Sequence, residues 1–248
     1  MECYVIAYGG GGVLTSEDGQ ATLVTRNTQG GTPFGKNWNY AESNLKERMD
    51  ALAADSRFSE IERAAIVPRT LDGIDPVVEN AMLWPLSIDE ANKLAKLLRT
   101  PNNTDWWLRS PSGNEYVPLA AYMSKESGKP NTSDGGFRNS FGVRPAFNID
   151  LNEVLFLTKV YRSESFDYDW SFTLLDSSRK FSAATTAVTT ENNKTVLTVA
   201  YSGAEVGEQI SLVVKNGEGG LTGFYKRLAT QIESADGVSL RSTFRRSS

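Results

Sequence analysis

The chain offers few side chains that could carry out nucleophilic or acid–base chemistry. Its 248 residues contain no histidine, which removes the most common general base, the usual base of a catalytic triad and the most common metal ligand. The single cysteine, Cys3, lies in the apolar run CYVIAY, and we interpret it as a small buried residue of a β-strand. One cysteine also excludes a disulfide within the chain. The sequence therefore argues against catalysis by histidine or thiol.

Motifs of other reaction classes are also missing. The chain has no Gly-x-Ser-x-Gly elbow, and the four glycines at 9–12 lack the Lys-Ser/Thr pair of a phosphate-binding loop, so we expect a flexible hairpin connection there. Carboxylate pairs for glycoside hydrolysis stay an open alternative, because such pairs form only in space. We expect no cofactor. Calcium is the alternative, with oxygens from Asp105, Glu126 and Asp134, although no run of the EF-hand type is present.

The side chains between residues 105 and 150 suit binding better than reaction. A long stretch rich in Asn, Ser, Gly and Lys lies between the pair Trp106–Trp107 and the run FGVRPAF. Tyrosine, asparagine, serine and glycine are typical of adaptable binding surfaces, although a solvated loop has a similar composition. The side chains that we predict to contact a ligand are Trp107, Arg109, Asn114, Tyr116, Tyr122, Lys125, Asn131, Asp134, Phe137, Arg138 and Asn139.

Four residues at the ends of this stretch have a second interpretation. Trp106 and Trp107 are neighbours, so on a strand they face opposite sides, and each is either a core residue or a stacking platform. Arg109 and Arg144 either pair with an anionic group of a ligand or fasten the polar stretch to a sheet through carboxylates and backbone carbonyls. We favour the core and the fastening roles, and keep the ligand contacts as alternatives.

Helices and strands must position these side chains. Asn39 with Glu42, Ser59 with Glu62 and Ser87 with Glu90 each have the spacing of a helix N-terminus. The first and the third are followed by apolar stripes, which are Leu45, Met49 and Leu52, and Leu94, Leu97 and Leu98. From Trp106 onward, runs such as WWLRS, EYVPLAAYM and GVRPAFNI are strand-like. After about Phe166, short β runs with regular turn signals predict a small all-β sandwich.

Composition excludes several partners. The formal net charge is −4 and no run of lysines and arginines occurs, which argues against nucleic acid. No apolar stretch reaches the roughly 18 residues of a membrane helix, and the first residues lack the features of a signal peptide. We therefore expect a folded protein that neither binds nucleic acid nor inserts into a membrane.

Four segments resemble a known family. NWNYAESNLKERMDAL, PLSIDEANKL, DWWLRSP and FGVRPAFNIDL occur in the order typical of DUF6273, and the resemblance covers about residues 1 to 158. It implies a C-type-lectin-like fold, related to formylglycine-generating enzymes, whose ligand surface would be the polar stretch between Arg109 and Phe141. The segments WSFTLLDSSRKFS and LTVAYSGAEVG resemble an Ig-like module. The expected fold class is α+β, with a C-type-lectin-like domain at residues 1–160 and a small all-β Ig-like sandwich at 161–248.

The resemblance implies a non-catalytic ligand-binding protein or adhesin. We expect it on a phage virion or at a bacterial or extracellular surface, with a host-cell surface protein or a glycan as its partner and other virion subunits as further partners. One alternative is a structural virion component whose loops pack against neighbouring subunits. Another is an enzyme of the formylglycine-generating type, which the lone Cys3 disfavours because that chemistry uses a pair of cysteines and a metal.

Overall fold

The chain folds into two compact units, Met1–Glu153 and Val154–Ser248. A computed structural model describes residues 2–8, 11–12, 17, 19–114, 117–133, 138–161, 168–174, 180–192, 194–206, 210–215, 223–229 and 237–245. The domain boundary expected at residue 160 falls inside strand β13 (Val154–Tyr161), the first element of the second unit. Each unit is described by itself.

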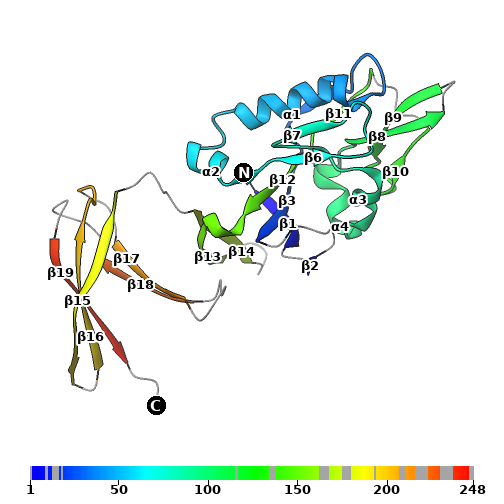
Figure 1. The fold of residues 1–248 in the computed structure, drawn as a ribbon. Helices are drawn as coiled ribbons and strands as arrows, with labels where there is room; N and C mark the ends of the chain where they lie inside the picture. Colours follow the sequence, from blue (N-terminus) through cyan, green and yellow to red (C-terminus); the bar gives the residue numbers. More distant parts are fainter. Residues whose placement is uncertain are drawn as a thin grey trace. The chain divides into compact units, whose positions relative to one another are not determined.

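The first unit contains a five-stranded antiparallel sheet, in which strands from the beginning and from the end of the unit's sequence are paired (Figure 1). The strand order is β2-β1-β3-β12-β5. These strands are β1 (Cys3–Tyr8), β2 (Gly11–Gly12), β3 (Gln20–Thr25), β5 (Ile66–Val67) and β12 (Ala146–Asp150). The pairing of Tyr8 with Gly11 shows that the glycine run enters a hairpin, as expected. Ile6, Leu23 and Val24 are buried, so this sheet contributes one wall of the core.

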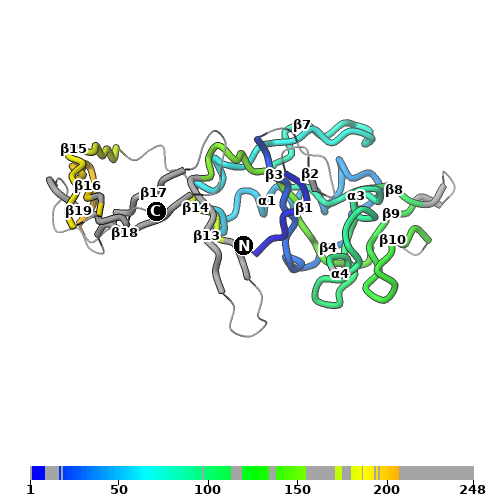
Figure 2. Tube along the Cα trace, turned by 90° about the horizontal axis from the view of Figure 1, so that it is seen from below, coloured from blue at the N-terminus to red at the C-terminus, as the bar shows by residue number. Residues whose placement is uncertain are grey.

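A second five-stranded sheet carries five of the eleven predicted ligand residues, namely Trp107, Arg109, Asn114, Tyr122 and Asn131. Its order is β10-β9-β8-β11-β4. The strands are β4 (Gly31–Pro33), β8 (Trp106–Asn114), β9 (Val117–Met123), β10 (Pro130–Asn131) and β11 (Ser140–Gly142). Strands β8, β9 and β10 lie side by side in both views (Figures 1 and 2). A separate hairpin joins β6 (Arg69–Leu71) to β7 (Val78–Ala81).

The two predicted capping boxes form. Ser59 accepts from the backbone nitrogen of Glu62 at the start of α2 (Glu60–Ala64). Ser87 does the same for Glu90 at the start of α3 (Ile88–Lys93). Each glutamate in turn accepts from the backbone of its serine, so two N–H groups that the first turn would leave unpaired are satisfied. The predicted positions of these two helix starts are confirmed.

The other helix boundaries differ from expectation. Asn39 caps only the 3-10 turn η1 (Tyr40–Glu42), because its side chain accepts from the nitrogen of Ala41. Ser43 caps the α-helix that follows, α1 (Asn44–Ala54), which buries Leu45, Met49 and Leu52 as predicted. The helix expected through Leu98 is broken, since Leu94 is extended and ends α3. The chain continues as α4 (Lys96–Arg99) and η2 (Pro101–Asn103).

The core of the first unit lies between the sheets and the helices. Its largest fully buried side chains include Trp84, Trp106, Trp107 and Tyr40. Trp84 exchanges two backbone hydrogen bonds with Ala146, which ties the segment before α3 to the first sheet. Such ties matter because buried backbone groups must be paired. The last turn of the unit, η3 (Leu151–Glu153), is held by a bond from the nitrogen of Leu151 to the oxygen of Gly19.

The second unit is all β in its described part, as its sequence pattern predicts. One hairpin pairs β13 with β14 (Tyr168–Leu174), and another pairs β17 (Ile210–Lys215) with β18 (Gly223–Ala229). A three-stranded sheet has the order β15-β16-β19. Its strands are β15 (Ser182–Glu191), β16 (Lys194–Ser202) and β19 (Gly237–Arg245). Among the described residues of the chain, no helix has the length and apolarity needed to span a membrane.

Candidate functional site

The polar stretch after Arg109 is more regular than its composition suggests. Its first part forms the hairpin of β8 and β9, in which Pro111 pairs with Ala120 and Ser112 with Leu119. A turn at residues 124–129 then leads into β10, which pairs with the end of β9. Strand pairing satisfies backbone groups that a free loop would leave to water, so turns and strand ends, rather than one long loop, present polar side chains.

Trp107 and Tyr122 lie inside this unit. Trp107 is fully buried and its indole Nε1 donates to the backbone oxygen of Thr32 over 2.7 Å. Its ring lies 5.3 Å from that of Phe34 and 4.6 Å from that of Phe141, between ring centroids. The ring of Tyr122 lies 4.4 Å from Phe141. The prediction that these two side chains contact an outside ligand is corrected, because aromatic packing covers both.

Trp106 faces the opposite side of β8 and is also fully buried. Its Nε1 donates to the oxygen of Arg99 over 2.8 Å, and the guanidinium of Arg144 lies 4.9 Å from its ring centroid. A cation over an indole face is attracted by the ring's quadrupole. Both faces of β8 are therefore covered at this point, which confirms the core interpretation of the two tryptophans.

Arg109 makes a buried ion pair rather than a ligand contact. Its Nη2 donates to Oε1 of Glu90 over 2.9 Å, its Nη1 donates to Oε2, and Nη1 also donates to the oxygen of Pro85 over 2.9 Å. Arg69 reaches the same carboxylate at 3.0 Å. Burial alone would raise the pKa of Glu90, but the hydrogen bond and charge of Arg109, with smaller contributions from Ser87 and Arg69, hold that pKa below its usual range. Arg109 thus fastens β8 to α3.

Arg144 fastens the two sheets together. It is fully buried at the junction of β11 and β12, in the run Gly142 to Ala146. Its Nε donates to the oxygen of Thr25 over 2.9 Å, and its Nη1 donates to the oxygen of Leu98. Among the described residues, Nη2 has no hydrogen-bond partner. Burial lowers the pKa of Arg144 to about 10, which still leaves the guanidinium charged at neutral pH.

The exposed polar side chains gather at the turn after β9 and before β11. We call this set the presented surface, and it consists of Lys125, Glu126, Ser127, Thr132, Ser133, Arg138, Asn139 and Ser140. The turn is fixed by backbone bonds from Ser124 to Lys129 over 3.0 Å and from Gly128 to Ser124 over 2.9 Å. The nitrogen of Lys125 also donates to Oδ1 of Asp105 over 2.7 Å. These bonds fix the backbone of the turn at residues 124–129.

The remaining predicted ligand residues have mixed positions. Asn131 is half-buried on β10, and its Oδ1 accepts from the nitrogen of Ser133 over 2.9 Å. Asn114 is on β8, and its side chain lies outside the part that the structure describes. Tyr116, Asp134 and Phe137 fall outside the described residues altogether. The structure therefore leaves Lys125, Arg138 and Asn139 exposed, whereas Trp107, Arg109 and Tyr122 are buried.

Comparison with known proteins decides the family. Residues 18–151 match DUF6273, a domain of unknown function, over more than half of the chain. The chain belongs to the DUF6273 family. No curated protein and no solved structure matches the chain at a significant level. The matched segment runs from just before β3 to η3, so the DUF6273 domain includes the second sheet, the ion pair of Arg109 and the presented surface.

Burial raises the pKa of two ionisable groups in the first unit. Burial raises the pKa of the Cys3 thiol to about 12, which keeps it protonated and unreactive at neutral pH. Burial, followed by the charge of Asp50, also raises the pKa of Tyr40. No group of three or more metal-ligating side chains occurs within the described part of the chain. Three carboxylates were considered as calcium ligands. Oδ1 of Asp105 accepts a hydrogen bond from the backbone nitrogen of Lys125, and Asp134 lies outside the described residues.

Sequence reasoning missed the partners of Arg109. Glu90 is recognisable as a capping residue, but the same carboxylate also binds Arg109 and Arg69, from elements 19 and 21 residues away. The signal that could have found it is a capping glutamate on a helix that must pack on an arginine-bearing strand. A glutamate that caps a buried helix end needs a cationic partner, because an unpaired buried carboxylate is costly.

Proposed function

We propose that the DUF6273 domain of this chain is a non-catalytic binding module whose presented surface contacts a macromolecular ligand. The single observation that supports this most directly is the contrast between exposed side chains and their buried anchors. Lys125, Arg138 and Asn139 are exposed, whereas Trp106 before them and Arg144 after them have no exposed surface.

This contrast favours binding for an energetic reason. A loop that must become ordered on association loses conformational entropy, and each immobilised side chain adds to that loss. Here the backbone of the turn is already fixed by bonds within itself and to Asp105. The exposed Lys125 on this turn can then contact a partner at a lower entropic cost. Arg138 and Asn139 add exposed polar groups directly before β11.

The finer fold assignments belong to the same proposal. We propose a C-type-lectin-like fold for the DUF6273 domain and an Ig-like fold for the second unit, which would act as a spacer or attachment module. The mixed helices and sheets of the first unit and the all-β second unit support this assignment. The partner would be a host-cell surface protein or a glycan, and the setting a phage virion or a bacterial surface.

A non-catalytic role is supported by the ionisable groups. The chain has no histidine, and the thiol of Cys3 stays protonated because its pKa is about 12. The most deeply engaged carboxylate, Glu90, is held ionised by two arginines and is committed to the fold. General acid–base catalysis works best with a group whose pKa lies near the working pH. These three observations favour binding over a reaction of the formylglycine-generating type.

The proposal is tested by binding of the purified full chain to bacterial cells and to an array of glycans, with and without added calcium. In the triple variant Lys125→Ala/Arg138→Ala/Asn139→Ala we expect binding to fall at least about tenfold, because three exposed contacts are lost. The matched control removes two positive charges and one amide elsewhere, at the exposed residues Asn152, Lys180 and Lys194. We expect the control to bind like the wild type.

Two results would contradict the proposal. One is that the wild-type chain binds no cell and no glycan under either calcium condition. The other is that the triple variant and the control variant lose binding equally, which would place the contacts elsewhere. Because all six substituted residues are exposed, thermal midpoints close to that of the wild type should confirm that folding is intact.

A further inference from the structure

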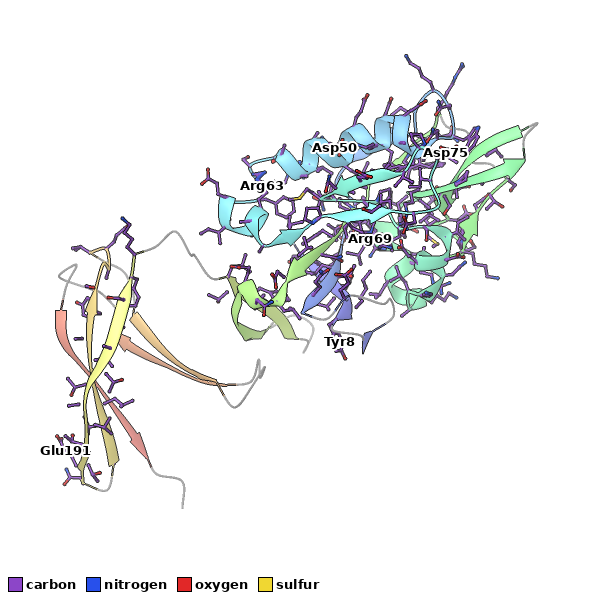
Figure 3. All side chains as sticks on the ribbon, in the orientation of Figure 1. Tyr8, Asp50, Arg63, Arg69, Asp75 and Glu191 are labelled. Atoms are coloured by element: carbon purple, nitrogen blue, oxygen red, sulfur yellow. The ribbon has the colours of Figure 1, made fainter. Side chains whose placement is uncertain are left out.

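A small pocket opens on the DUF6273 domain at a different place from the presented surface. It has a volume of about 140 Å³ and lies where η1, the β6–β7 connection and β8 meet. Its lining includes Trp38, Asn39, Tyr40, Ile74, Asp75 and Arg109. Figure 3 shows Asp75 on the connection between β6 and β7, near the start of α1. At roughly 30 Å³ per water molecule, the volume corresponds to about five waters, the scale of one sugar ring.

Trp38 gives this pocket an aromatic wall that is open to solvent. Trp38 is 43% exposed, whereas Trp84, Trp106 and Trp107 have no exposed surface. The chain on either side of Trp38 is held in place. The nitrogen of Asn39 donates to Oδ1 of Asn37 over 3.0 Å. A large ring left exposed on a fixed backbone is typical of a contact surface, because burying it would otherwise stabilise the fold.

The charges around the pocket are of both signs. Asp75 is exposed and makes no ion pair with another described residue. Arg109 is positive but both of its Nη atoms already donate to Glu90, and Arg69 adds a second positive charge there. Within the pocket lining, an anionic ligand would therefore meet Asp75, and a cationic ligand would meet Arg109. A neutral ligand avoids both repulsions.

Hydrogen-bonding groups at the pocket match hydroxyls. The carboxylate of Asp75 accepts hydrogen bonds only. Asn39 uses its Oδ1 to cap η1, over 3.0 Å to the nitrogen of Ala41, so its side-chain amide nitrogen is the group left to donate. A hydroxyl can donate to the first and accept from the second. The combination of an aromatic face, an acceptor and a donor suits a ring that bears several hydroxyls on an otherwise apolar frame.

We propose that this pocket binds one residue of a neutral saccharide, with the sugar ring against Trp38 and its hydroxyls bonded to Asp75 and Asn39. The pocket is separate from the presented surface, since none of its lining residues belongs to that set. It stands independently of the function proposed above.

The test uses the purified full chain and an array of neutral hexose and N-acetylhexosamine oligosaccharides together with their sialylated forms, followed by calorimetric titration of the best neutral binder. We expect Trp38→Ala to weaken binding at least about tenfold and Trp38→Phe to restore part of it, because phenylalanine keeps a ring face. Tyr8→Ala is the matched control. Tyr8 is 58% exposed and lies well away from Asp75 (Figure 3).

A second variant separates neutral from charged ligands. Asp75→Asn removes the charge and keeps an acceptor oxygen, so a neutral saccharide should lose only about two- to fivefold in affinity, within the range of a single hydrogen bond. An anionic ligand would instead bind Asp75→Asn more tightly than the wild type. The triple variant Lys125→Ala/Arg138→Ala/Asn139→Ala should keep saccharide binding in this pocket, which separates this proposal from the presented surface.

Three results would overturn the proposal. The first is that the wild-type chain binds no neutral saccharide. The second is that Trp38→Ala binds the saccharide as well as the wild type does. The third is that the wild type prefers sialylated to neutral oligosaccharides. Equal thermal midpoints of Trp38→Ala and wild type should show that a loss of binding is not a loss of folding, because the exposed ring contributes little to the core.

Discussion

Arg109 donates from Nη2 to Oε1 of Glu90 over 2.9 Å, and both side chains are buried in the DUF6273 domain. The other carboxylate oxygen of Glu90 accepts from the backbone nitrogen of Ser87 over 2.9 Å. One carboxylate therefore both caps α3 and holds β8 against it. Removal of that carboxylate should affect the helix start and the sheet together.

The variant Glu90→Gln should lower the free energy of unfolding by about 3 kcal/mol or more. The reason is that Arg109 stays buried without its counter-charge, and breaking one side of a buried pair typically costs 3–5 kcal/mol. Urea denaturation of the full chain, followed through the transition of the first unit, measures this change. The control is Asp50→Asn, which breaks the exposed pair of Lys46 and Asp50 and should cost no more than about 0.5 kcal/mol. Equal effects of the two variants would contradict the structural role of Glu90.

Glu90 should also make stability depend on pH in acid. Its pKa in the folded state is lowered below the ordinary value of 4.5 that the unfolded chain has. Between these two values the unfolded state binds more protons, so the stability is present above about pH 4.5 and is lost as the pH falls through the folded pKa. Denaturation at a series of pH values should show a steeper loss below pH 4.5 for the wild type than for Glu90→Gln. Parallel curves would count against this pairing.

Arg144→Lys should destabilise the DUF6273 domain although the charge is kept. A lysine presents one ammonium group and cannot reach the oxygens of Thr25 and Leu98 while it covers the ring of Trp106. We expect a loss of about 2–4 kcal/mol, measured as a shift in the thermal midpoint and in urea. The control, Arg26→Lys, changes a partly exposed arginine and should have little effect. A midpoint like that of the wild type would show that the guanidinium shape is not required.

Gly142→Ala should strain the connection between the two sheets. A Cβ at this position would lie 2.5 Å from Cγ2 and 3.0 Å from Cβ of Thr28, and 3.1 Å from the backbone oxygen of Asp105. Overpacking of this kind typically costs about 1–3 kcal/mol. The second-site variant Thr28→Ala removes the nearest atom, so the double variant should recover part of the loss in thermal stability. If the Gly142→Ala protein is as stable as the wild type, Thr28 and the backbone at Asp105 must shift away from the new Cβ at little cost.

The local features of the fold could be predicted from the sequence. The capping pairs at Ser59 and Ser87 give their own signal within four residues, and the structure confirms both. The burial of Leu45, Met49 and Leu52 follows from helical spacing alone. The break at Leu94 could not be predicted in this way, because leucine has high helix propensity and the break is imposed by the tertiary structure.

The site was harder to predict, because exposure is set by distant parts of the chain. Tyr122 and Lys125 both lie in a polar-looking stretch, yet Phe141 covers the first and solvent surrounds the second. Residues 120–123 of β9 are all buried, so both faces of the strand are covered there, and that covering comes from distant parts of the chain. The residues next to Trp38 in the sequence give no pattern that distinguishes this exposed tryptophan from the buried ones.

The covering of β8 on both faces at Trp106 and Trp107 has an evolutionary consequence. With the scaffold secured there, changes at Lys125 or at Arg138 and Asn139 touch only solvent-facing atoms, and substitutions of that type usually alter stability by less than about 0.5 kcal/mol. Under the proposed binding function, selection on recognition would thus proceed almost free of selection on whether the domain folds. Related domains could then diverge in specificity through a handful of codons.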